Sequence, residues 1–196
     1  MKKGTIILLC IGGALLLLIC FGISKYNGLV EAETAVDQKW SDVETQYQRR
    51  ADLIPNLVST VKGYAAHESE TLESVVAARA KATQVTVDAS SLTSESVAKF
   101  NDAQGELSTA LGRLLLIQEN YPDLKANENF RDLQAQLEGT ENRIATERMK
   151  FNQAVKDYNT SIRRFPNNIF ASVFGFEKKG YFEAQAGAEA APKVEF

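Results

Sequence analysis

The sequence predicts an all-α protein: an N-terminal transmembrane helix, then an antiparallel four-helix bundle of long, heptad-patterned helices, then an aromatic-rich C-terminal tail. Three observations predict this fold class. A long uncharged run lies near the N-terminus, apolar residues then recur every three or four positions, and only 12 Gly and 4 Pro occur in 196 residues. Apolar residues at this spacing share one face of a helix. We therefore divide the chain into a short cytoplasmic N-terminus at 1–3, a transmembrane helix at 4–24, the bundle at 25–165 and the aromatic-rich segment at 166–196.

Residues 4–24 are predicted to cross a membrane. The run is uncharged, with Lys2 and Lys3 before it and Lys25 after it. At about 1.5 Å per residue, a helix of this length spans roughly 30 Å, which is the thickness of the hydrocarbon core of a bilayer. The alternative is a cleaved signal peptide, whose apolar core is shorter, about 7–15 residues, and ends in a small-x-small site. No such site follows this run.

The charges beside the span favour a cytoplasmic N-terminus and a large domain on the other side of the membrane. Lys2 and Lys3 precede the span, whereas acidic residues such as Glu31 and Glu33 soon follow it. Positive charge is enriched on the cytoplasmic side of membrane helices.

The first helix of the domain is predicted over about 26–66. Its apolar residues follow a heptad spacing: Val36, Trp40, Val43, Tyr47, Ile54, Leu57, Val61 and Tyr64. The pattern skips one apolar position between Tyr47 and Ile54, and Arg50 occupies it. Pro55 lies inside the pattern without shifting its phase, which predicts one long helix kinked near 51–55. No Pro or Gly-rich break separates this helix from the span, so we expect the two to be nearly continuous.

Three more helices are predicted. The first covers 69–86, with Ser69 as its cap. The second begins at a cap, Thr93 or Ser94, and ends at Tyr121 because Pro122 stops it, and the third extends from near Asn127 to Arg164. The last carries Phe130, Leu137, Ile144, Phe151, Tyr158 and Phe165 at seven-residue intervals. A short helix is expected after Asn167, followed by an extended tail. Each apolar stripe must be buried against another, which favours the bundle.

The composition argues against most chemistry. The net charge of −3 disfavours a nucleic-acid binder, which needs a basic surface. A di-iron bundle needs two Glu-x-x-His pairs and a zincin needs HExxH, but the chain has one His, His67, expected at a helix end. We also find no phosphate-binding Gly loop and no catalytic constellation. We expect no enzyme, cofactor, metal or small-molecule substrate.

One polar cluster stands out, formed by Arg49, Arg50 and Asp52 with Pro55 and Asn56. Arg is seldom buried without a partner, yet Arg50 falls on the apolar seam. It is interpreted either as a structural ion pair with Asp or Glu of a neighbouring helix, or as a polar contact with another subunit or protein.

The C-terminal segment is rich in aromatic residues, holding six of the ten Phe within 165–196. The interaction or structural candidates there are Phe170, Phe174, Phe176, Tyr181, Phe182, Pro192 and Phe196. Two interpretations stay open. The aromatic side chains cap the open end of the bundle, or they form a patch that contacts a protein or the membrane interface.

Three segments resemble the LemA family: YNxLV at 26–30, VDQKWSDVETQYQRRADLIPNLVSTVKGYAAHE at 36–68 and FPNNIFASVFGFEKKGYFEA…APKVEF at 165–196. The layout of one N-terminal span and a helical domain is similar too. This resemblance implies a bacterial membrane protein with an antiparallel helical-bundle fold and no established enzymatic activity. Family members are often encoded beside other membrane proteins, which implies a membrane-protein partner.

We therefore expect a non-enzymatic scaffold protein of the bacterial cell envelope, held in the inner membrane by lipid contacts of 4–24 and assembled into homo-oligomers through its helical domain and tail. The alternative is a regulatory adaptor that binds a membrane protease or an envelope enzyme. A third possibility is lipid remodelling by the aromatic tail.

Overall fold

The structure is a computed structural model that describes residues 3–183. Its elements in chain order are α1 (Lys3–Tyr64), α2 (Ser69–Gln84), η1 (Ala89–Ser91), α3 (Ser94–Leu116), η2 (Ile117–Glu119), α4 (Pro122–Ala126), α5 (Glu128–Arg163) and α6 (Asn167–Phe174). All of these elements are helical, which confirms the predicted all-α class.

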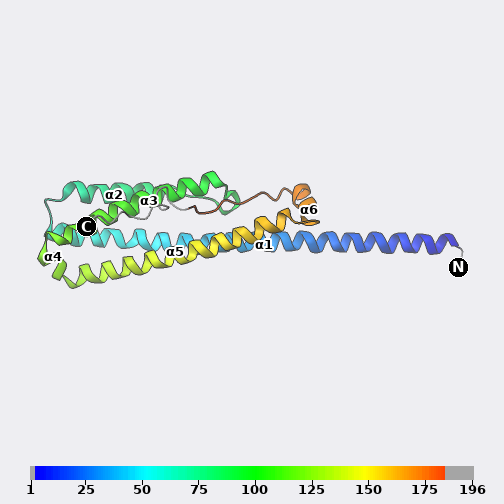
Figure 1. Ribbon diagram of the computed structural model, residues 1–196, viewed down its shortest axis with the longest axis horizontal. Coiled ribbons are helices and arrows are strands. Elements are labelled where there is room, and N and C mark those ends of the chain that lie inside the picture. The colour runs from blue at the N-terminus through cyan, green and yellow to red at the C-terminus, as the bar shows by residue number, and fades with distance from the viewer. Residues whose placement is uncertain (1–2, 184–196) are drawn as a thin grey trace, which may run out of the picture.

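Helix α1 is one uninterrupted helix of 62 residues that includes both the apolar run and the first helix of the domain. It continues through Pro55 without a break. An 18-residue window near its N-terminus has a mean hydropathy of 1.6, and only 6% of that window is buried against the rest of the protein. In Figure 1 this part of α1 projects beyond all other helices. It is a candidate membrane span.

The helix ends agree with the sequence in two places. The Thr93 side chain caps α3 by accepting a hydrogen bond from the Ser96 N–H (3.1 Å), and Asn127 caps α5 by accepting from the Phe130 N–H (2.9 Å). Both use the side-chain oxygen that a helix N-terminus needs. Ser69, by contrast, does not cap α2, which begins with it and has no side-chain cap.

The predicted helix ending at Tyr121 is shorter than expected. Helix α3 ends at Leu116, and the chain tightens into the 3-10 turn η2. Pro122 then begins the short helix α4 instead of only ending the one before it. Proline suits the first helical position because the N–H that it lacks would be unpaired there.

The long helices lie side by side in a narrow domain (Figure 1). Helix α1 packs along α5, α2 packs on α3, and α2 also contacts α1. The short α6 packs on both α5 and α1. Since the loops between the long helices are short, neighbouring helices along the chain run in opposite directions.

The core has two separate clusters. The membrane-proximal cluster extends along α1 from Leu29 to Tyr47, and the distal cluster begins at Ile54. On α3 the proximal cluster ends at Phe100 and the distal cluster begins at Leu107. On α5 the distal cluster ends at Leu137 and the proximal cluster begins at Ile144. The buried polar residues Arg50, Gln104 and Thr140 occupy the gap.

Candidate interaction surfaces

Arg50 is the centre of a polar layer between the two core clusters. Its side chain is 1% exposed, and its Nη1 donates to Glu141 Oε1 on α5 (2.8 Å) and to the Ser108 hydroxyl on α3 (2.7 Å). Its Nη2 donates to Gln104 Oε1 (2.6 Å), and the Gln104 amide in turn donates to the Ala82 carbonyl of α2 (3.3 Å). One guanidinium group thus connects all four long helices.

The rest of the predicted polar cluster lies on the opposite side of α1. Arg49, Asp52, Pro55 and Asn56 are all exposed, and Asp52 accepts a hydrogen bond from Gln48 one turn earlier (2.8 Å). The structure therefore separates Arg50 from the residues that the sequence grouped with it. Whether any of them contacts another protein stays a prediction.

The exposed Pro55 has a structural counterpart on α2. In a helix, the N–H of residue 55 would bond the carbonyl of residue 51, but proline has no N–H. Arg79 of α2 replaces it, since its Nε donates to the Ala51 carbonyl at 2.8 Å. This bond satisfies the carbonyl that Pro55 leaves open, and it joins α1 to α2.

Residues 176–183 form an extended strap held along the proximal half of the domain. Two Asn side chains of α5, seven residues apart, each bond the strap backbone twice. Asn159 bonds the N–H (3.0 Å) and carbonyl (2.9 Å) of Lys179, and Asn152 bonds the N–H and carbonyl of Phe182, both at 2.9 Å. Each Asn side-chain amide donates to the carbonyl and accepts from the N–H of the same strap residue, so the position of the strap along α5 is fixed.

Phe182 is the anchor of the strap. Its buried ring stacks on Trp40 (centroids 5.7 Å apart, planes at 17°) and contacts Phe151 edge-on (5.4 Å). Gly180 lets the strap backbone lie close to the start of α3, because a Cβ at this position would be only 2.6 Å from the Ser94 Cα. The Gly180 N–H also donates to the Leu92 carbonyl (2.8 Å).

The strap brings a charge into the proximal half. Lys179 is buried and its Nζ lies 2.9 Å from Glu33 on α1. Burial raises the pKa of the neighbouring Asp37, more than the Lys179 charge lowers it. Burial also raises the pKa of Tyr158 above its usual range, and nearby carboxylates such as Glu33 add to that effect. These groups form a structural cluster around the strap.

The other aromatic candidates lie near the end of the apolar run. Phe170 of α6 lies edge-on to Phe21 (6.3 Å), while Phe174 and Phe176 lie 4.9 and 5.8 Å from the Tyr26 ring. Phe165, which the heptad pattern placed on the buried seam, follows the end of α5 and is 82% exposed, so that expectation is wrong. Tyr181 is exposed. Pro192 and Phe196 lie outside the described residues.

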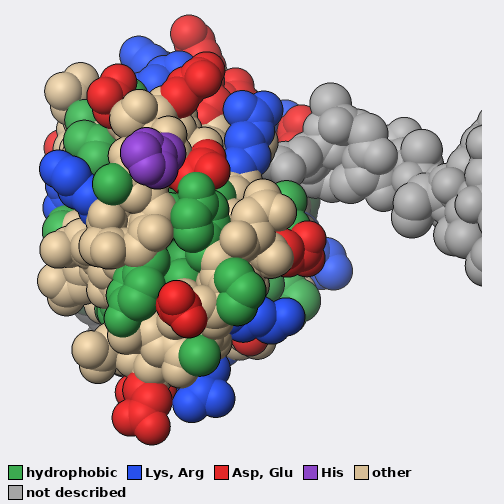
Figure 2. Space-filling model, turned by 90° about the vertical axis from the view of Figure 1, so that its left-hand side faces the viewer, with side chains coloured by type: hydrophobic (Ala, Val, Ile, Leu, Met, Phe, Trp, Pro, Cys, Tyr) green, Lys and Arg blue, Asp and Glu red, His purple; other side chains and the backbone are tan. Residues whose placement is uncertain are grey.

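A shallow apolar groove of about 400 Å³ lies between α1 and α2 near the distal end. It is lined mainly by small and apolar side chains, including Val58, Leu72, Val76, Ala77 and Ala80. Figure 2 views the distal end and shows hydrophobic side chains exposed among charged ones, beside the single His. His67 lies in the turn between α1 and α2 and is exposed. Among the side chains that the structure describes, which exclude those of residues 5–10, no three from His, Cys, Asp or Glu gather in a way that could hold a metal ion.

Together these features define, over the residues that the structure describes, an all-helical protein with one candidate membrane helix. The model of the LemA family matches residues 39–196, which is most of the chain. The chain belongs to the LemA family, and this confirms the resemblance found in the sequence.

Curated relatives are similar over most of this chain. Magnetosome protein MamQ of Magnetospirillum gryphiswaldense is 28% identical over 183 residues, which cover 84% of this chain and 67% of the relative. Magnetosome protein MamQ 1 of Paramagnetospirillum magneticum is 26% identical, covering 85% and 68%. Protein LemA of Metamycoplasma hominis is 22% identical, covering 83% and 70%. None of these names denotes an enzymatic activity, and the family indicates a membrane-associated protein.

Sequence reasoning missed several structural residues. Asn152 and Asn159 are polar residues on a long helix, and without the strap they resemble solvent-facing positions. Their seven-residue spacing on the apolar side of α5 was the available signal. Glu141 was missed because nothing in its local sequence distinguishes it from the other exposed carboxylates.

Proposed function

We propose that this chain is a non-enzymatic, membrane-anchored scaffold that assembles with copies of itself through its helical domain and tail. In this proposal α1, α2, α3 and α5 act as an antiparallel four-helix bundle. Residues 4–24 anchor it in a bacterial inner membrane, with the N-terminus in the cytoplasm and the domain outside.

The observation that carries the proposal is the continuity of α1. One helix of 62 residues belongs to both the apolar run and the domain. A rigid connection of this kind suits a spacer that holds its domain at a fixed place relative to the bilayer. Flexible linkers, which let a tethered domain search for a substrate, are rich in Gly and Ser.

The polar layer supports the non-enzymatic part. Arg50 is held by three partners, so it has a structural role. An enzyme places perturbed titratable groups in a pocket that admits a substrate, and such pockets measure roughly 300–1,000 Å³. Burial raises the pKa values of Glu44 and Tyr47, but the cavity that they line measures only about 110 Å³. Burial also raises the pKa values of Asp37 and Tyr158, which lie near charged residues of the strap.

The distal groove supports assembly with another copy or with a partner. Val76 is 52% exposed at the groove, and the lining is mostly apolar. Confinement of anchored copies to one membrane plane raises their effective concentration, so a modest contact is enough for association. The same groove also supports the alternative, an adaptor that binds a membrane protease or an envelope enzyme.

Light scattering and single-particle imaging of the detergent-extracted full-length protein test the proposal. We expect a large, regular particle. Val76→Glu should make it smaller, whereas Gln84→Glu, which adds the same charge to α2 outside the groove, should not. A monodisperse monomer in the unmodified protein would contradict the scaffold proposal. Crosslinking in cells would then test the adaptor alternative.

A further inference from the structure

Helix α6 lies beside α1 where the apolar run ends. Its Phe170 ring is 6.3 Å from Phe21, and its Phe174 ring is 4.9 Å from Tyr26. Figure 1 shows that α6 lies across the long axis of the molecule, whereas the long helices follow it. A helix that crosses a membrane-spanning helix in this way lies along the membrane plane.

The side of α6 that faces away from the protein is apolar. Ile169 and Val173 are four residues apart, so they share a face, and they are 53% and 72% exposed. Phe174, at the end of α6, is 55% exposed, and Phe165, which lies two residues before the start of α6, is 82% exposed. Large apolar side chains gathered in this way mark an interaction surface.

Two observations indicate lipid as the occupant of this face. First, the face is continuous with the apolar run of α1, since α6 contacts the last turn of that run at Phe21 and the first turn after it at Tyr26. Second, the exposed Arg163 and Arg164 lie immediately before Phe165, whereas after α6 the exposed Lys178 is balanced by the exposed Glu177 beside it. Basic residues beside an apolar helical face suit the anionic headgroups of a membrane.

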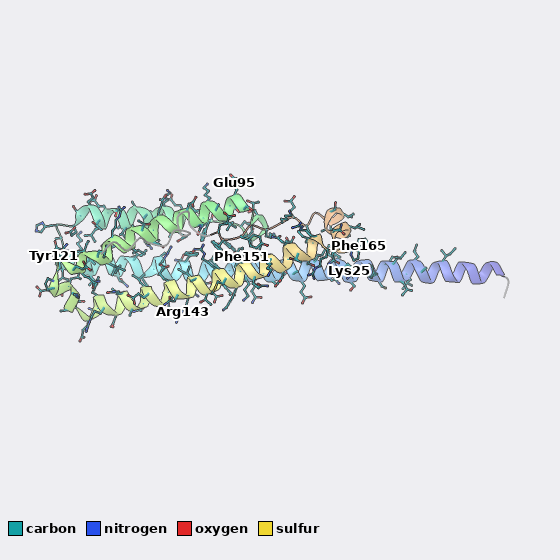
Figure 3. The ribbon with its side chains drawn as sticks, in the orientation of Figure 1. Lys25, Glu95, Tyr121, Arg143, Phe151 and Phe165 are labelled. Carbon is teal, nitrogen blue, oxygen red and sulfur yellow. The ribbon has the colours of Figure 1, made fainter. Side chains whose placement is uncertain are left out.

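The level of the face also fits a bilayer surface. Lys25 ends the uncharged run, so the boundary of the hydrocarbon core falls near residue 24. In Figure 3, Phe165 and Lys25 lie at the same level along the long axis. Tyr26 lies one residue further, and Tyr is enriched at membrane–water interfaces.

We propose that α6 and Phe165 form an interfacial membrane contact. The apolar face of α6 lies in the boundary between headgroups and acyl chains of the same bilayer that α1 spans. With α1 as one contact and α6 as the second, the membrane fixes the depth and tilt of the domain. This inference rests on the part of the proposed function that places residues 4–24 in the membrane.

Brominated lipids test the proposal, because bromine quenches tryptophan fluorescence only at short range. The full-length protein carrying Val173→Trp is reconstituted into phosphatidylethanolamine–phosphatidylglycerol vesicles brominated either near the headgroups or near the bilayer centre. Leu16→Trp, an exposed position within the run, reports on the span. Leu116→Trp, an exposed apolar position at the end of α3, is the matched control outside the membrane. The native Trp40 is buried in the core, about 24 Å beyond the run at 1.5 Å per residue, and supplies the background.

We expect the Val173→Trp emission to shift to the blue and to lose intensity most with bromines near the headgroups. Leu16→Trp should lose it most with central bromines, and Leu116→Trp should stay at the Trp40 background. Quenching at Leu16→Trp but not at Val173→Trp would overturn the α6 contact alone. Quenching at neither would overturn both the span and the contact. A Val173→Trp shielded from both bromolipids and aqueous iodide would overturn the lipid contact, because protein would then cover the face.

Discussion

The membrane-proximal and distal halves of the domain are built from different side chains. The proximal cluster contains linked rings, with Trp40, Tyr47, Phe100, Phe151 and Phe182 in contact at centroid distances of 5.1 to 6.4 Å. The buried distal cluster is nearly all aliphatic, and Phe130 is the one aromatic residue among its described members. The halves also differ in how they are closed.

The distal half is closed almost entirely by helices, because α1, α2, α3, α4 and α5 all contribute residues to its core, and Ala65 just after α1 is the one buried member outside a helix among its described residues. The proximal half needs a non-helical segment, the strap, which inserts Phe182 between helices. The difference shows that a helical heptad pattern specifies one half of this domain. The other half depends on a pairing between α5 and a segment far along the chain.

The largest expected effect comes from removing one ring in each half. Phe182→Ala and Phe130→Ala should each lower the free energy of unfolding by about 3 kcal/mol or more, the usual cost of emptying a buried aromatic site. Only Phe182→Ala should also release the strap, because Phe182 anchors it. Chemical denaturation measures the first effect, and cleavage by trypsin after Lys178 or Lys179 measures the second. Equal protection of the strap in both variants would contradict its dependence on Phe182.

Next in size is the layer between the halves. Arg50→Leu should keep the helix content but lower the free energy of unfolding by about 2 kcal/mol, because Gln104 and Ser108 lose their charged partner. Circular dichroism and denaturant titration check this. Arg49→Leu is the control, since Arg49 is the exposed neighbour. We also expect Arg50→Leu to alter assembly; unchanged melting and unchanged assembly together would contradict both interpretations of Arg50.

A smaller effect tests the bond at Pro55. Arg79→Leu should cost about 1–2 kcal/mol, since it leaves the Ala51 carbonyl without a donor. In a Pro55→Ala background residue 55 regains its N–H, so the same change should cost about 1 kcal/mol less. Lys81→Leu, which breaks an exposed ion pair with Glu106, serves as the control on α2. An identical cost of Arg79→Leu in both backgrounds would show that Arg79 does not replace the missing donor.

The smallest effect concerns pH in the proximal half. Burial raises the pKa of Asp37 in the folded protein, so the folded state holds this proton more tightly than the unfolded state does. Its contribution to stability therefore falls as pH rises through the unfolded pKa toward the folded one. Asp37→Asn should melt at a higher temperature than the unmodified protein near about pH 7, and the difference should vanish near about pH 3. A gain that persists at the acidic end would assign the effect to something other than this ionisation.

The sequence predicted what local spacing determines. Neighbouring residues predicted four features that the structure has: a cap at Thr93, which was one of two candidates, a helix start near Asn127, His67 close to a helix end, and a first helix continuous with the apolar run. The partners of Arg50 and the docking of Phe182 depend on helices that meet far apart in sequence, so spacing could not assign them. Phe165 shows the opposite error. It extends a seven-residue pattern by one step, but α5 has already ended.

The continuity of α1 from Lys3 to Tyr64 has a further consequence for any assembly. From Lys25 to Val58, the first residue of α1 that lines the distal groove, the helix rises about 50 Å at 1.5 Å per residue, so the groove lies that far from the boundary of the apolar run. The direction in which the groove faces, viewed along the axis of α1, is also fixed relative to the residues of the apolar run, because one continuous helix carries both. If two copies of the chain contact each other through their apolar runs, the residues in that contact would thus determine whether the two distal grooves face each other.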